Sequence, residues 1–316
     1  MNGNKIICGD AVDILRTLPS KSVNCCITSP PYYGLRDYGV AGQIGREESP
    51  ELYIARLVEV FREVKRVLRD DGTLWIVIAD SYADWSYAKK IRFSSKHSIE
   101  NVATHQEFRA SIKPKDMIGI PWSLALALRE DGWYLRSEVI WHKPNPVPES
   151  CRNRPTRSFE HVFLLSKDYH YYYDQDAVKE PIATGTTARR KRAVSGNHKY
   201  ADAAIGQPLQ TFNRPRLNKS GENMALPDTR NLRDVWSVSV KPYHGAHFAV
   251  FPTELITPCI LAGCPAGGTV IDPFFGSGST GVSAATLGRR YIGIDINPEY
   301  CALAEERLRG VMPADE

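Results

Sequence analysis

The sequence has no apolar run that approaches the length needed to cross a bilayer, and its first residues lack the basic and apolar regions of a signal peptide. These absences predict a cytoplasmic protein without a membrane partner. The seven cysteines are scattered and form no CxxC pair. Neither a disulfide framework nor a zinc site is therefore indicated, and we expect no metal.

Charge is unevenly distributed along the 316 residues, whose apolar content is ordinary for a soluble globular protein. The net charge is only +4, yet residues 179–241 hold 12 Lys and Arg against 5 Asp and Glu. A basic region joined to a mildly acidic body favours a surface for a polyanion. A solvated loop is the plainer alternative for such a run. The length suits one large α/β domain with an insertion, or two domains.

Apolar periodicity alternates between strands and helices through most of the chain. It predicts helices at 12–18, at 54–68, from about 116 to 130 and after Pro252. Residues 80–115 lack a clear period and are interpreted as a long loop that is a candidate lid. Strands are predicted at 5–8, 23–28, 73–79, 133–142, 159–165, 169–173, 269–272 and 291–294. This alternation is typical of an α/β fold with a parallel sheet.

A proline motif, residues 28–34 (TSPPYYG), follows the apolar strand at 23–28. Two consecutive prolines donate no backbone hydrogen bond and keep the chain extended, so the carbonyls of Ser29 and Pro30 have no obvious internal partner. Two tyrosines follow and are suited to flank a flat ring. The motif predicts a pocket for a planar group that carries hydrogen-bond donors. An ordinary strand exit with core tyrosines remains open as an alternative.

A glycine-rich turn, residues 273–281 (PFFGSGSTG), lies between a predicted strand and a helix. Gly276, Gly278 and Gly281 match the G-x-G-x-x-G fingerprint, and Asp295 ends the next strand, where an acidic side chain can bind ribose hydroxyls. No lysine follows the last glycine, which argues against a phosphate-binding P-loop. A plain helix cap is the competing interpretation.

The order of the motifs discriminates between cofactors. A nicotinamide-binding domain needs a second mononucleotide-binding half, whereas one helix follows Asp295 here. We therefore expect the N-terminal strands to complete the sheet, with the strand at 5–8 beside the strand that ends at Asp295. Asp10 would then lie beside the adenine, and the proline motif would open at the same carboxyl edge.

Three motifs together carry a family resemblance: residues 28–34, residues 272–280 (DPFFGSGST) and residues 247–255 (HFAVFPTEL). The chain resembles the β-class, permuted DNA amino-methyltransferases over residues 1–166 and 247–309, and its TSPPY motif is most similar to the cytosine-N4 type. The resemblance implies a doubly wound, mostly parallel sheet of the Rossmann-like methyltransferase fold with circularly permuted motif order. It implies a catalytic half at 1–166, a target-recognition region at 167–240 and a cofactor half at 241–316.

The function implied by the resemblance is site-specific methyl transfer from S-adenosylmethionine to the N4 amine of a flipped cytosine in double-stranded DNA. Adenine N6 is the alternative within the class. More distant alternatives are a nucleotide-sensing DNA-binding protein without catalysis and a nicotinamide oxidoreductase. A cognate restriction endonuclease and a second copy of the chain are further partners that the family suggests.

Site residues follow from the same resemblance. The predicted catalytic residues are Ser29, Pro30, Pro31 and Tyr32. The predicted cofactor-binding residues are Asp10, Phe251, Pro252, Thr253, Asp272, Phe274, Gly276, Gly278 and Asp295. The basic run itself, which matches no motif of the family, predicts phosphate contacts at Arg189, Arg190, Lys191 and Arg192. Residues 143–148, with Trp141, frame either the base pocket or a rigid connector.

Overall fold

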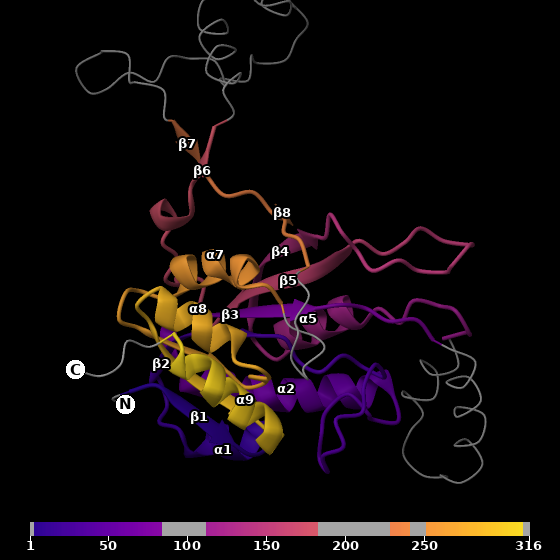
Figure 1. Ribbon diagram of the computed structural model, residues 1–316, viewed down its shortest axis with the longest axis horizontal. Helices are drawn as coiled ribbons and strands as arrows, with labels where there is room; N and C mark the ends of the chain where they lie inside the picture. Colours follow the sequence, from indigo (N-terminus) through magenta and orange to yellow (C-terminus); the bar gives the residue numbers. More distant parts are fainter. Residues whose placement is uncertain (1–2, 84–111, 183–227, 241–250, 312–316) are drawn as a thin grey trace, which may run out of the picture. The chain divides into compact units, whose positions relative to one another are not determined.

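The computed structural model describes residues 3–83, 112–182, 228–240 and 251–311 (Figure 1). The elements of the larger part are β1 (Lys5–Cys8), α1 (Ala11–Thr17), β2 (Val23–Thr28), α2 (Pro50–Val67), β3 (Leu68–Ile78), α5 (Ile120–Glu130), β4 (Tyr134–His142), β5 (Phe159–Ser166), β8 (Val235–Ser237), α7 (Thr253–Gly263), β9 (Thr269–Asp272), α8 (Ser279–Thr286), β10 (Arg290–Asp295) and α9 (Pro298–Arg309). None of the described helices is long and apolar enough to span a membrane.

Eight strands form one mixed sheet in the order β1-β10-β9-β2-β3-β5-β4-β8. The first five are parallel, β5 is antiparallel to β3 and to β4, and β8 is parallel to β4. Helix α2 packs against α1 and α5, while α8 packs against α7 and α9 (Figure 1). The predicted α/β fold with a mostly parallel sheet is confirmed.

Strands from both ends of the sequence lie side by side in this sheet. Cys8 of β1 is in register with Asp295 of β10, and Cys26 of β2 is in register with Ile271 of β9. The inner strands β2 and β9 are buried along nearly their whole length, as expected for parallel strands covered on both faces. As a result the proline motif and the glycine-rich turn leave neighbouring strands at the same carboxyl edge, as the motif order predicts.

Three local predictions differ from the structure. Strand β3 begins at Leu68 rather than at 73, because residues 69–72 belong to an irregularity in its pairing with β2. Helix α5 begins at Ile120 rather than near 116, because Gly119 adopts a left-handed φ of 85°. The Asp80 carboxylate caps this start by accepting hydrogen bonds from the Gly119 and Ile120 amides. Residues 169–173 form no strand, so that prediction is wrong.

The chain divides into two compact units, Met1–Asp174 with Asp234–Glu316, and Gln175–Arg233. The smaller unit is narrower than the 167–240 expected from the sequence. In its described part, a short 3-10 helix (Asp176–Val178) is followed by β6 (Glu180–Pro181), which pairs with β7 (Thr229–Arg230). The predicted phosphate contacts at residues 189–192 lie outside the described residues, as does most of the candidate lid.

Candidate active site

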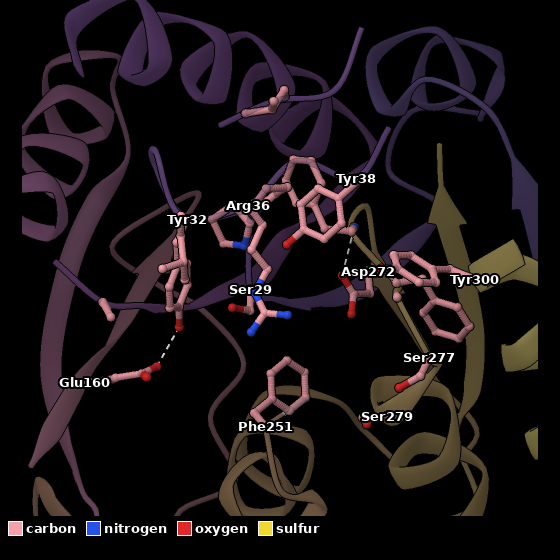
Figure 2. Close-up of a pocket in the computed structure, with 18 of the residues that line it drawn as sticks. Ser29, Tyr32, Arg36, Tyr38, Glu160, Phe251, Asp272, Ser277, Ser279 and Tyr300 are labelled. Carbon is pink, nitrogen blue, oxygen red and sulfur yellow. Dashed lines mark hydrogen bonds between the residues drawn. The ribbon is translucent and has the colours of Figure 1, made fainter. Parts of the chain in front are cut away.

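One cavity of about 620 Å³ opens at the carboxyl edge of the sheet (Figure 2). The residues that line it follow the ends of β1, β2, β3, β9 and β10 or belong to the β4–β5 hairpin. Others lie in the loop at 35–44 and at Val240 and Phe251. Among the predicted site residues, those that line it are Asp10, Ser29, Pro30, Pro31, Tyr32, Phe251, Asp272, Phe274, Gly276 and Asp295. Pro252 and Gly278 are chain neighbours of lining residues and Thr253 is two positions from Phe251, but these three do not line the cavity themselves.

We call residues 272–279 with Asp295 the glycine corner. Asp295 accepts hydrogen bonds from the amides of Gly276 (2.7 Å) and Asn297 (2.9 Å), and burial raises the pKa of its carboxyl while these bonds oppose the rise. Each carboxylate oxygen can accept more than one hydrogen bond. Asp295 therefore positions the glycine-rich turn and still offers acceptors to a ligand.

Glycines within and next to this corner make room for the turn and for the ring of Phe275. Gly276 and Gly278 have φ values of 50° and 80°, which residues other than glycine rarely adopt. A Cβ at Gly281 would lie 2.6 Å from the Phe275 ring, and one at Gly293 would lie 2.3 Å from it. The third glycine of the fingerprint thus serves packing of α8 onto Phe275.

Asp272 links the two motifs. Its Oδ1 accepts from the Thr28 hydroxyl (2.5 Å) and the Phe274 amide (3.0 Å), and its Oδ2 accepts from the Thr280 hydroxyl (2.6 Å). Burial is the main cause that raises the pKa of this carboxyl to about 6. Since Thr28 is the first residue of the proline motif, Asp272 fixes the end of β2 against the start of α8. A contact between Asp272 and the cofactor stays a prediction.

We call residues 29–32 with Trp141, Lys143 and Glu160 the proline corner. The Tyr53 hydroxyl donates to the Pro31 carbonyl (2.8 Å), whereas no described residue donates a hydrogen bond to the Pro30 carbonyl. Pro30 lines the cavity, and within the described part of the chain its carbonyl has no donor. That matches the donor-carrying ligand that the motif predicts.

A network of polar side chains closes the proline corner. The Tyr32 hydroxyl donates to Glu160 Oε2 (2.5 Å), as Figure 2 shows, and the Lys143 ammonium donates to Glu160 Oε1. Lys143 also lies 4.4 Å from the centre of the Trp141 ring, within range of a cation–π contact. Burial, and then the nearby Glu160 carboxylate, raise the pKa of Tyr32 well above its usual value. The hydroxyl therefore keeps its proton.

Several residues that line the cavity were not among the site residues predicted from the sequence. Glu160 lies 128 positions from Tyr32 and carries no motif of its own, and Asp80 lies in the stretch without periodicity. Tyr38 and Tyr300 meet edge to face with ring centres 6.1 Å apart at the glycine corner. Tyr38 follows the proline motif so closely that proximity is a usable signal. Asp10 lines the cavity as expected, and its Oδ1 also caps α1 through the Val12 amide (2.9 Å).

Comparisons with known proteins agree with this geometry. Residues 23–306 match the N6_N4_Mtase family model, described as DNA methylase. The type II methyltransferase M.Cfr9I of Citrobacter freundii is 46% identical, over 98% of this chain and 89% of its own length. The type II methyltransferase M.SmaI of Serratia marcescens is 44% identical, over 96% of this chain and 90% of its own length.

Solved structures share the fold at lower identity. The PvuII DNA methyltransferase (cytosine-N4-specific) has a TM-score of 0.61 at 16% identity, with 97% of this chain and 86% of that chain covered. The putative DNA modification methylase TTHA0409 of Thermus thermophilus, solved as a complex with S-adenosyl-L-methionine, has a TM-score of 0.59 at 23% identity, with 99% and 97% covered. Given a family model that matches most of the chain and relatives this similar along nearly all of it, the chain belongs to the N6/N4 DNA methylase family and is an S-adenosylmethionine-dependent DNA methyltransferase that acts on an exocyclic amine.

Proposed function

We propose that this enzyme methylates the N4 amine of a cytosine within a specific site of double-stranded DNA. The observation that carries the proposal is the one cavity that Ser29, Pro30 and the glycine corner line together, with no described residue that donates to the Pro30 carbonyl. Its volume of about 620 Å³ falls within the range of small-molecule sites, roughly 300–1,000 Å³.

The proline corner supplies the acceptors that the reaction needs. The lone pair of an exocyclic amine is delocalised into the ring, which makes the amine a poor nucleophile. The Ser29 hydroxyl and the Pro30 carbonyl accept the two amino hydrogens, so that the lone pair leaves conjugation and is directed at the incoming methyl group. Tyr32 stacks on the base. Positioning and electrostatics then drive an in-line displacement without a covalent intermediate.

The glycine corner holds the methyl donor. S-adenosylmethionine supplies a sulfonium methyl group when bound. Asp295 accepts the ribose hydroxyls, Asp10 binds the adenine amino group, and Phe274 and Gly276 lie along the ribose and methionine end. The residues of the α7 start that contact the amino-acid moiety are Phe251, Pro252 and Thr253. Asp272 and Gly278 complete this set, Asp272 through the link to Thr28 and Gly278 through the turn at the start of α8.

DNA contacts complete the proposal. The target amine is paired inside a duplex, so the base has to be flipped into the cavity. We assign the target-recognition role to the inserted region around residues 175–233, with residues 189–192 as phosphate contacts. A cognate restriction endonuclease, a homodimer and a cytoplasmic location remain predictions.

The choice of cytosine rests on Ser29, because a serine at the first position of the signature is commoner in cytosine-N4 enzymes by the resemblance. The PvuII DNA methyltransferase, whose fold is similar, is itself named as cytosine-N4-specific. Adenine N6 is the second candidate, since both amines need two acceptors.

The test is to label DNA with tritiated methyl donor, digest it to nucleosides and separate the products. N4-methylcytosine is the expected product, and N6-methyladenine would overturn the choice of base. The family membership already rules out the nicotinamide and non-catalytic alternatives.

A further inference from the structure

Glu160 is a charged side chain of the proline corner, and the reaction described above gives it no role. It lies on β5, its side chain is only 12% exposed, and both of its oxygens are engaged, by Tyr32 and by Lys143. A carboxylate this far from water requires a charged partner, and the Lys143 ammonium, itself 19% exposed, supplies one. The pair is therefore built into the wall of the cavity.

The direction of the hydrogen bonds in this network has a chemical consequence. An ionised carboxylate only accepts, so the single Tyr32 proton is committed to Glu160. On its other side, the Tyr32 oxygen can only accept. The position of the Tyr32 ring, which is assigned to stack on the base, is therefore tied to the β4–β5 hairpin through this one bond.

We propose that Glu160, paired with Lys143, is a positioning residue that fixes the Tyr32 ring in the place where it stacks on the base. The proposal rests on the methyl transfer proposed above and holds for either base. It extends the site from the four residues of the proline motif to the β4–β5 hairpin. Tyr32 is thereby in place before the base enters, so the site does not have to rearrange during the reaction step.

A structural clasp is the competing role, because ion pairs also join adjacent strands. The chain offers a matched control. Glu138 on β4 bonds to His161 on β5 (2.5 Å), and its side chain is 27% exposed. This pair belongs to the same hairpin but does not line the cavity. Removing the Glu138 charge should therefore test the hairpin without touching the site.

The experiment compares full-length wild type with Glu160→Gln, Tyr32→Phe, the double variant and Glu138→Gln. A glutamine at position 160 has one acceptor oxygen for two donors. With that oxygen on the Lys143 ammonium, the NH₂ group faces the Tyr32 hydroxyl, which loses its acceptor. Single-turnover methyl transfer is measured with saturating S-adenosylmethionine and a duplex that the wild type methylates. Donor affinity is measured separately by calorimetry.

We expect Glu160→Gln and Tyr32→Phe each to lower the single-turnover rate constant by about tenfold to a hundredfold, the range typical of misplaced positioning groups. The double variant should be no slower than the slower single variant, because both changes remove the same contact. Donor affinity should stay at the wild-type value, and Glu138→Gln should transfer methyl at the wild-type rate.

The proposal is overturned if Glu160→Gln transfers methyl at the wild-type rate, if the two losses multiply in the double variant, or if Glu138→Gln loses as much as Glu160→Gln. Should Glu160→Gln not fold, Tyr32→Phe breaks the same hydrogen bond from the other side and a wild-type rate for it overturns the proposal equally. A wild type that methylates no DNA refutes the proposed function instead, which keeps the two failures distinct.

Discussion

The glycine corner and the proline corner face each other across one cavity, yet they are assembled over very different distances along the chain. The bond that positions the glycine-rich turn joins Gly276 to Asp295, 19 positions apart. The bond that positions Tyr32 joins it to Glu160, 128 positions away. A site formed by residues close in sequence can be recognised as a motif. Where distant elements form the site, the sequence reveals only the residues of the motif and not their partners.

The two corners also differ in what limits their shape. Backbone conformation and absent Cβ atoms shape the glycine corner, where the Phe275 ring occupies the space that side chains at Gly281 and Gly293 would fill. Side-chain hydrogen bonds shape the proline corner. We therefore expect substitutions in the glycine corner to affect stability and donor binding, and substitutions in the proline corner to affect the rate of transfer.

The sharpest test of this comparison is Ser29→Ala. Loss of one preorganised group at the reacting amine should lower the single-turnover rate by about 10²–10³-fold. Donor affinity should not change, because the glycine corner is left intact. The matched control is Ser22→Ala, at the other end of β2, where the hydroxyl bonds to the Pro19 carbonyl in an exposed loop. A large loss of donor affinity in Ser29→Ala would show that the corners are not separable.

Asp272→Asn tests the link between the corners. Burial raises the pKa of this carboxyl to about 6 in the folded protein, so folding favours the protonated form. Its contribution to stability is full below the unfolded pKa, near 3.9, and is lost as the pH rises through about 6. Two pKa units correspond to about 3 kcal/mol. Between pH 4 and pH 7, the unfolding free energy of wild type should therefore fall by up to about 3 kcal/mol more than that of Asp272→Asn.

Urea unfolding at the two pH values measures this difference. The carboxyl of Asp295, whose pKa is also raised by burial, is present in both proteins and cancels from the comparison. Equal pH slopes for the two proteins would mean that Asp272 does not titrate in this window.

The same contrast between local and distant contacts explains what the sequence predicts. The strands at 5–8, 23–28 and 269–272 are predicted to the residue, because each is a short apolar run closed by a turn. Their neighbours in the sheet follow from motif order. The start of α5 is not predictable in this way, because its cap is Asp80, 39 positions before Gly119. The role of Glu160 is equally hidden, since only packing of β5 beside β3 brings it to Tyr32.

Gly293→Ala tests the glycine corner alone. The new Cβ would lie 2.3 Å from the Phe275 ring, in a strand that is buried around this position. Overpacking of this kind costs about 1–3 kcal/mol. We expect a lower Tm and weaker donor binding. Gly310→Ala is the control, because its Cβ would come no closer than 3.7 Å to other atoms. If Phe275→Leu added to Gly293→Ala restores none of the loss, the ring is not the cause.

Tyr53→Phe should give the smallest effect on the rate of methyl transfer, and it tests whether the proline corner tolerates a change behind it. The Tyr53 side chain is fully buried, and its hydroxyl donates to the Pro31 carbonyl at 2.8 Å. Removing the donor leaves that carbonyl unpaired, which costs about 1–3 kcal/mol of unfolding free energy. The methyl-transfer rate should stay close to wild type, because Pro31 is not one of the two acceptors assigned to the amine. Denaturant unfolding and single-turnover kinetics on the same preparation measure both quantities. A rate loss as large as that of Ser29→Ala, with stability unchanged, would mean that the Pro31 carbonyl itself takes part in holding the base.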